Sequence, residues 1–178
     1  MKKSASAHLK LVVILSLMSA LSILLGKYLA FNVGGMLRFS LENLPIVFSG
    51  LAFGPLAGAA VGLISDLVGC FLVGYEINPL VTLGAAVIGL VSGFVRMMIP
   101  KELSKPWLVV SLTELSAHLI GSVIIKTIGL SAYYSTPFFI LMLWRLLNYL
   151  IIGVLEGAVV YAILKNPTIK KEINSIRK

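Results

Sequence analysis

The chain has 178 residues, of which 58% are hydrophobic and only 12% charged, and its mean hydropathy is +1.01. This composition excludes an ordinary soluble domain. The net charge of +8 does not indicate a nucleic-acid-binding protein, because the basic residues flank apolar runs and form no stripe interleaved with aromatic residues. The composition instead indicates a membrane protein that crosses the bilayer several times.

Six apolar stretches are predicted along the chain. A membrane-spanning helix requires about 20 residues. Five stretches have about that length: residues 9–31, 56–75, 79–97, 107–129 and 137–164. The first stretch is too long for a signal peptide and is followed by no small-residue cleavage site, so we expect it to remain in the mature protein.

The second stretch, residues 42–54, is too short to cross a bilayer by itself. It begins at Asn43, with Pro45 close behind, and ends at Gly54-Pro55, which are typical helix boundaries. The preceding residues 32–42 are therefore expected to dip into the membrane as a partly re-entrant first outer loop. Irregular backbone is tolerated at that depth only against protein or a water-filled cavity, so this loop predicts an outward-facing pocket.

The predicted fold is an all-α membrane protein with six transmembrane helices, no strands, and one polytopic domain over residues 1–178 that ends in a short tail at 165–178. Its topology follows from the basic residues. Eleven of the fifteen Lys and Arg residues fall before the first stretch, around one middle loop or in the tail: Lys2, Lys3, Lys10, Arg96, Lys101, Lys105, Lys165, Lys170, Lys171, Arg177 and Lys178. The positive-inside rule then predicts that both termini are cytoplasmic.

Four cations remain, and this topology places them in or near the outer half of the bilayer: Lys27, Arg38, Lys126 and Arg145. Charges at such depths are rare and usually functional. Asp66 and Arg145 have similar predicted depths, with Asn148 on the same helix face as Arg145. Since an uncompensated charge there costs about 3 kcal/mol, either Asp66 and Arg145 form a structural ion pair, or one or both contact a polar solute that enters from outside.

A second polar group is predicted closer to the cytoplasm. Glu114 and His118 are separated by one helical turn in the fifth stretch, and Glu156 has a depth similar to that of Glu114. The ligand count is too low for a zinc site. We therefore expect no metal and no cofactor, and interpret these residues as structural hydrogen-bonding groups or as a conformational coupling element.

Small residues recur at four-residue intervals in several stretches: Gly54, Gly58 and Gly62, then Gly89 and Gly93, then Gly153 and Gly157. This spacing predicts close packing of helices within the bundle. Ser16 and Ala20 form a similar pair in the first stretch. That pair indicates either internal packing or a docking groove for another membrane subunit.

Aromatic residues are frequent in the predicted outer loops, where an interfacial belt explains many Tyr and Trp side chains. They are Phe39, Tyr75, Tyr133, Tyr134 and Phe138, with Trp144 further down the sixth stretch. Next to Arg38, Asn78, Ser135 and Thr136, some of them are also suited to sandwich a planar heterocycle. Motifs of hydrolases, zinc proteases and ATP-binding loops are absent from the sequence, so we expect no enzyme.

Several short motifs occur in a fixed order: Leu37-Arg38-Phe39-Ser40-Leu41-Glu42-Asn43-Leu44-Pro45-Ile46, Ser49-Gly50-Leu51-Ala52-Phe53-Gly54-Pro55-Leu56-Ala57-Gly58, Ser65-Asp66-Leu67-Val68-Gly69, Gly74-Tyr75-Glu76-Ile77-Asn78-Pro79, and Ser135-Thr136-Pro137-Phe138 followed by Arg145. Over nearly the whole chain this order resembles the folate-family substrate-binding (S) components of energy-coupling-factor (ECF) transporters. Such S components carry an Ala-x-x-x-Ala-type docking motif on the first helix, and this chain has Ser16 and Ala20 at the two matching positions.

The resemblance implies a high-affinity folate-binding subunit of an ATP-driven importer in the bacterial cytoplasmic membrane. It would capture folate from outside and deliver it through a transmembrane T component and two ABC-type ATPases. The residues expected to bind the substrate are Arg38, Phe39, Ser40, Asp66, Tyr75, Asn78, Tyr133, Ser135, Thr136, Arg145 and Asn148. A carboxylate such as Asp66 suits the donor edge of a pterin, and Arg38 or Arg145 suits the glutamate carboxylates.

Two alternatives stay open. Within the same class, the substrate is another vitamin or a modified-base precursor. In a different class, the chain is an autonomous proton-coupled carrier that uses Asp66, Glu114, His118 and Glu156. The second alternative is disfavoured because the sequence has no repeated half and no matching pair of broken helices.

Overall fold

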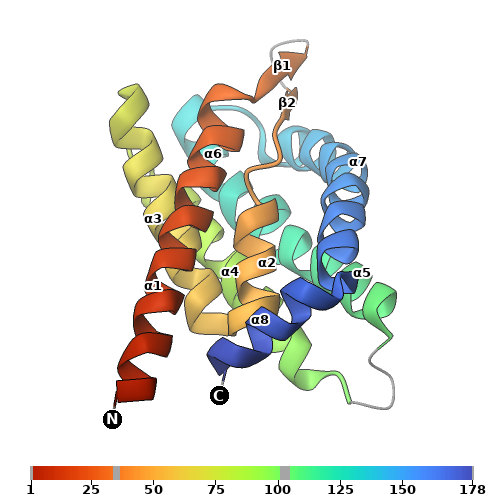
Figure 1. Ribbon diagram of the computed structural model, residues 1–178. Helices are drawn as coiled ribbons and strands as arrows, with labels where there is room; N and C mark the ends of the chain where they lie inside the picture. The colour runs from red at the N-terminus through yellow and green to blue at the C-terminus, as the bar shows by residue number, and fades with distance from the viewer. Residues whose placement is uncertain (1, 34–36, 101–104, 178) are drawn as a thin grey trace.

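The computed structural model describes residues 2–33, 37–100 and 105–177, so Lys101 and Lys178 of the predicted basic flanks lie outside the described residues. The chain forms a bundle of helices with one small hairpin (Figure 1). In chain order the elements are α1 (Lys2–Ile23), the π-helical η1 (Leu24–Tyr28), β1 (Phe31–Val33), β2 (Leu37–Phe39), α2 (Leu44–Phe53), α3 (Pro55–Val73), α4 (Pro79–Met98), α5 (Pro106–Ala117), the π-helical η3 (His118–Ile125), α6 (Lys126–Tyr134), α7 (Phe138–Lys165) and α8 (Pro167–Arg177).

Within the described parts of the chain, five segments are long and apolar enough to cross a membrane: Ala7–Tyr28, Pro55–Val73, Pro79–Met98, Pro106–Tyr134 and Phe138–Lys165. Only 17% of the apolar window in the first and 11% in the last is buried inside the protein. Apolar side chains therefore cover the outer faces of α1 and α7, as lipid contact requires. The predicted helical membrane architecture is confirmed, whereas the count of six full spans is not, because α2 has only 10 residues.

The short helix α2 lies in the middle of the bundle, next to α1 and α4 in Figure 1. Nine of its ten residues are buried, and their side chains form part of the hydrophobic core. The helix ends at Gly54, whose φ of 101° lies in the left-handed region that favours glycine. At its start, the Leu44 amide donates a hydrogen bond to Glu156 Oε1 of α7 at 3.0 Å. This bond supplies a partner for one of the free amides of the first turn.

The loop before α2 contains two short antiparallel strands, which the sequence-based expectation of no strands did not include. Phe31 pairs with Phe39 and Asn32 with Arg38. The Phe31 and Phe39 rings stack with centroids 5.4 Å apart, and Asn148 Nδ2 of α7 donates to the Arg38 carbonyl at 2.8 Å. Cross-strand stacking and this bond from α7 together hold the hairpin in place.

The glycine spacing corresponds to close approach of α3 and α4, as predicted. A Cβ atom on Gly58 would lie 2.5 Å from the Gly89 carbonyl oxygen, and one on Gly62 would lie 2.2 Å from the Ala85 carbonyl oxygen. Because the nearest atoms belong to the backbone, they cannot move aside to make room for a side chain at Gly58 or Gly62. The two helices therefore pack backbone against backbone and form a rigid wall behind α2.

The start of α1 and the end of α8 lie at the end of the bundle opposite to the hairpin (Figure 1). The predicted polar tail forms α8, whose Ile173 packs into the core. The chain thus has one end with both termini and another with the hairpin, and the candidate site includes residues of the hairpin.

Candidate functional site

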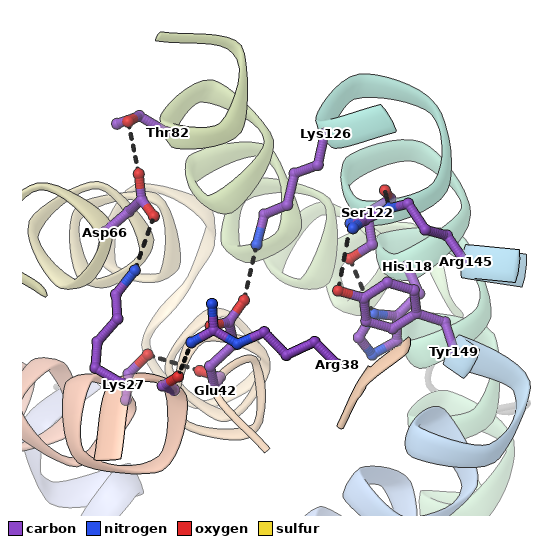
Figure 2. Close-up of polar contacts among 12 residues, drawn as sticks. Lys27, Arg38, Glu42, Asp66, Thr82, His118, Ser122, Lys126, Arg145 and Tyr149 are labelled. Atoms are coloured by element: carbon purple, nitrogen blue, oxygen red, sulfur yellow. Dashed lines mark hydrogen bonds and ion pairs between the residues drawn. The ribbon is translucent and has the colours of Figure 1, made fainter. Parts of the chain in front are cut away.

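A cavity of about 480 Å³ lies between the hairpin, η1, α3, α6 and α7. Its polar wall contains four cations and two carboxylates, contributed by five separate parts of the chain (Figure 2). They are Lys27, Arg38, Glu42, Asp66, Lys126 and Arg145. All four cations that the sequence places in the outer half of the bilayer therefore line one cavity.

Asp66 of α3 has three side-chain neighbours, one of which is the Cys70 thiol, a weak donor to Asp66 Oδ1 at 3.9 Å. Thr82 Oγ1 of α4 donates to Asp66 Oδ2 at 2.6 Å, and Lys27 Nζ lies 3.9 Å from Asp66 Oδ1. The Lys27 ammonium also lies 5.7 Å from the centre of the Tyr75 ring. Lys27 reaches this position from the π-helical segment η1, which has one more residue per turn than the expected α-helix.

Glu42 and Lys126 form the second ion pair of the wall. Lys126 Nζ lies 3.2 Å from Glu42 Oε1, and the Lys126 side chain is nearly fully buried. The Glu42 backbone carbonyl accepts a 2.6 Å hydrogen bond from Ser22 Oγ of α1. The residue is therefore fixed at both its main chain and its side chain.

The two arginines have no carboxylate partner within the described parts of the chain. Arg38 donates to the Gly26 carbonyl. Arg145 donates from Nε to the Ser122 carbonyl at 3.0 Å, and from a terminal nitrogen to Tyr149 Oη at 3.4 Å (Figure 2). Since the lysines are matched by Glu42 and Asp66, the wall carries a formal excess of two positive charges at these arginines.

The structure therefore does not pair Asp66 with Arg145, which was one of the two interpretations of these charges. Among the described residues, the ion-pair partner of Asp66 is Lys27. Arg145 contacts a backbone carbonyl and a tyrosine hydroxyl instead.

Seven of the eleven residues expected to bind substrate line the cavity: Arg38, Ser40, Asp66, Tyr75, Thr136, Arg145 and Asn148. The Oδ1 atom of Asn148 is buried and accepts no hydrogen bond from the described residues. Buried amide oxygens normally have a partner. Asn148 Oδ1 is thus an unsatisfied acceptor in the wall of the cavity.

The other four expected residues do not line the cavity. Asn78 caps α4 by accepting from the Leu80 amide at 3.0 Å, and its Nδ2 donates to the Gly129 carbonyl. Tyr133 donates to Glu76 at 2.6 Å, and Phe39 stacks on Phe31. Ser135 ends α6 with a φ of 51°.

Several wall residues were not in the expected set: Lys27, Glu42, Lys126, Tyr134, Trp144 and Tyr149. The sequence did contain a signal for the two lysines, because both are cations inside apolar stretches. Tyr149 had no such signal, since a tyrosine in an apolar helix is common.

The residues of the second polar group, Glu114, His118 and Glu156, also lie close together. His118 Nε2 lies 2.9 Å from Glu156 Oε2 and 3.1 Å from Glu114 Oε2. The His118 ring stacks on Tyr149 with centroids 4.7 Å apart, so the cluster adjoins the wall of the cavity. Among the described residues, these three side chains are the group whose ligand atoms are close enough together to hold a metal ion.

The two residues expected to dock another subunit lie on the outside of the bundle. Ser16 and Ala20 are exposed on α1, whereas Ser19 between them is buried and donates to the Leu15 carbonyl. Internal packing, the other interpretation of this pair, is therefore disfavoured.

Comparison with known proteins gives a family match. Residues 6–170 match the family model described as ECF-type riboflavin transporter, S component. No curated protein sequence matches the chain significantly.

Two solved structures share the fold. The crystal structure of FolT bound with folic acid superposes with a TM-score of 0.68 at 22% identity, over 84% of this chain and 89% of that one. The structure of the S component of a bacterial ECF transporter superposes with a TM-score of 0.64 at 16% identity, over 89% of this chain and 99% of that one. The expectation of an ECF S component is confirmed, and the chain belongs to the family of ECF-type riboflavin transporter S components, which are subunits of transporters and not enzymes.

Proposed function

We propose that this chain is a high-affinity folate-binding S component that captures folate outside a bacterial cell. It delivers the vitamin across the cytoplasmic membrane together with a T component and two ABC-type ATPases. Both termini are cytoplasmic in this proposal, and the cavity opens outward. This orientation is supported by the positions of the termini and the hairpin at opposite ends of the bundle (Figure 1), and by the basic residues around the termini.

The positive charge of the cavity wall is the main reason for proposing folate as the substrate. Folate ends in a glutamate with two carboxylates, and the wall has an excess of two positive charges, at Arg38 and Arg145. Both guanidinium groups bond only to neutral oxygens among the described residues. Planar guanidinium groups bind carboxylates through strong, charge-assisted hydrogen bonds. A dianion would therefore neutralise this part of the wall.

The remaining lining suits the ring system. Tyr75, Tyr134, Trp144 and Tyr149 line the cavity and supply flat faces for a pterin or an aminobenzoyl ring. The donor edge of a pterin requires acceptors. Asp66 and the unpaired Oδ1 atom of Asn148 are suitable acceptors in the same wall.

The exposed pair Ser16 and Ala20 on α1 supports docking to a T component, since small side chains let two helices approach closely. Transport by the chain alone is the competing mechanism. Uptake into proteoliposomes, with and without the T component and ATPases, distinguishes them, because an autonomous carrier would import its substrate without either partner.

Riboflavin is the second candidate substrate, because the matching family model is described by that vitamin. Riboflavin is also planar and fits aromatic walls, but it carries no carboxylate. If it is the substrate, Arg38 and Arg145 lack the anionic partner that their charges require.

Three ligands test the proposal: folate, pteroate, which is folate without its glutamate, and riboflavin. Titration calorimetry of the purified chain, without ATP, should show tight folate binding. Pteroate, which has one benzoate carboxylate instead of the two of glutamate, should bind more than about tenfold more weakly, because it loses at least one charge-assisted bond of about 1.5–3 kcal/mol. Tight binding of riboflavin with no heat from folate or pteroate would overturn the folate assignment.

A further inference from the structure

Three buried ionisable side chains meet between α5, η3 and α7, outside the folate-binding wall. Glu114 and His118 are 4% exposed, and Glu156 is fully buried. Their ligand atoms all lie within 4.8 Å of one another. Two carboxylates so close together in an apolar bundle repel each other unless positive charge lies between them.

The spacing matches a metal site. His118 Nε2 faces both carboxylates, at 2.9 Å from Glu156 Oε2 and 3.1 Å from Glu114 Oε2. Zinc binds imidazole nitrogen and carboxylate oxygen at about 2.0–2.2 Å, which sets tetrahedral ligand atoms about 3.3 Å apart. The two separations from His118 Nε2 are shorter than that value by about 0.2–0.4 Å, and all three ligand atoms lie within 4.8 Å of one another.

One member of the cluster has a single polar neighbour. Glu114 Oε2 lies 3.1 Å from His118 Nε2, and apart from this contact neither of the two buried Glu114 oxygens has a hydrogen-bond partner among the described residues. A buried carboxylate with so few donors is destabilising. A divalent cation would coordinate Glu114 and, together with Glu156, leave the cluster electrically neutral.

The other two side chains are oriented through the atoms that a metal would not use. His118 Nδ1 lies 3.2 Å from Ser122 Oγ, so the Nδ1–H group can donate a hydrogen bond to Ser122. In that tautomer Nε2 has a free lone pair and can serve as the metal ligand. Glu156 Oε1 accepts the Leu44 amide, which leaves Oε2 directed at His118. Metal-binding side chains are usually fixed by second contacts of this kind.

The cluster adjoins a groove of about 380 Å³ between α5, η3 and α7, whose other lining residues are mainly apolar. A single bound water molecule beside the three side chains would complete a four-coordinate site with three protein ligands.

We propose that Glu114, His118 and Glu156 bind one divalent transition-metal ion of the Zn²⁺ class, which ties α5 and η3 to α7. One imidazole and two carboxylates favour Zn²⁺ or a similar ion over Mg²⁺ and Ca²⁺, which prefer more ligands and only oxygen. This proposal departs from the sequence-based expectation of no metal, because α7 supplies a third ligand beside the two on α5 and η3.

The test uses purified chain in detergent, carrying an affinity tag without histidine and freed of metal with a chelator. Zn²⁺ binding is measured by competition with a chromophoric chelator, and Co²⁺ binding by visible absorption. The wild type should bind one equivalent of either ion with micromolar or tighter affinity, and Co²⁺ should give the intense bands of a four-coordinate site. Glu114→Gln should weaken binding by more than about 100-fold, and Ser122→Ala by about tenfold.

Matched controls use the other histidine and an exposed carboxylate, His8→Asn and Glu172→Gln, which should bind like the wild type. Folate binding and a single gel-filtration peak show whether each variant is folded. If Glu114→Gln does not fold, the wild-type stoichiometry and Ser122→Ala still decide the question. The proposal is overturned if the wild type shows no saturable binding below millimolar metal, or if folded Glu114→Gln binds the metal as tightly as the wild type.

Discussion

Lys126 Nζ lies 3.2 Å from Glu42 Oε1, which joins α6 directly to the residues before α2. The lysine chain passes over Gly84 of α4, where an added Cβ would lie 2.5 Å from Lys126 Cγ. The pair is therefore built by three segments that are far apart in sequence. Both residues line the cavity, so the pair joins the segment after the hairpin to α6 within the wall of the site.

Lys126→Met should lower the free energy of unfolding by about 3 kcal/mol, the lower end of the range for breaking a buried ion pair. The lower end applies because Glu42 keeps 24% of its side chain exposed. Unfolding in mixed detergent micelles measures the change. Adding Glu42→Gln should restore part of the loss, since no unpaired charge then remains. The exposed Lys165→Met serves as control, and an equal loss there would contradict the assignment.

Arg38→Ala and Arg145→Ala should each weaken folate binding by about 1.5–3 kcal/mol and weaken pteroate binding less, because pteroate has only one carboxylate, on its benzoate ring. Each guanidinium contacts only neutral oxygens among the described residues, so its anionic partner would come from the ligand. Titration calorimetry with both ligands measures the difference. Arg96→Ala, in the last turn of α4, is the matched control. Wild-type folate affinity in both folded cavity variants would show that neither arginine binds the ligand.

Gly89→Ala should destabilise the protein by about 2–3 kcal/mol, because the new Cβ would lie 2.1 Å from the Gly58 backbone and force α3 and α4 apart. Gly153→Ala is the matched control. Its Cβ meets only His118 Cδ2 at 3.5 Å, and alanine has the higher helix propensity. Thermal unfolding should give a clearly lower midpoint for Gly89→Ala than for Gly153→Ala. Equal midpoints would argue against backbone contact between α3 and α4.

Ser16→Trp and Ala20→Trp should abolish transport by a reconstituted complex and leave folate affinity near that of the wild type. Both residues are exposed on α1, and an indole ring prevents close approach of a partner helix. Leu150→Trp, on an exposed face of α7, is the control and should transport normally. Intact uptake in both α1 variants would exclude this face as the docking surface. Combined loss of binding and uptake would indicate internal packing instead.

The sequence alone determined which segments enter the membrane and where close packing occurs. Hydropathy over about 20 residues marks a spanning helix whatever its neighbours are. Glycine spacing marks close contact because only the absence of a side chain permits it. Three cations of the cavity wall lie inside predicted apolar stretches and the fourth, Arg38, lies in the predicted re-entrant loop, and charges at such depths are usually functional.

Tertiary structure decided which of these residues meet. Asp66 and Arg145 have similar depths, but depth along a helix gives no angle around the bundle, and Asp66 faces Lys27 instead. The π-helical segments η1 and η3 also change which side chains meet. Their wider i→i+5 turns alter the direction in which the following side chains point, compared with an α-helix. The same limit applies to Glu156, which reaches His118 only because α7 packs on α5 and η3. Strands of three residues are likewise too short to show a periodic pattern in the sequence. The hairpin is held by tertiary contacts, namely the hydrogen bond from Asn148 of α7 and the stacking of Phe31 on Phe39.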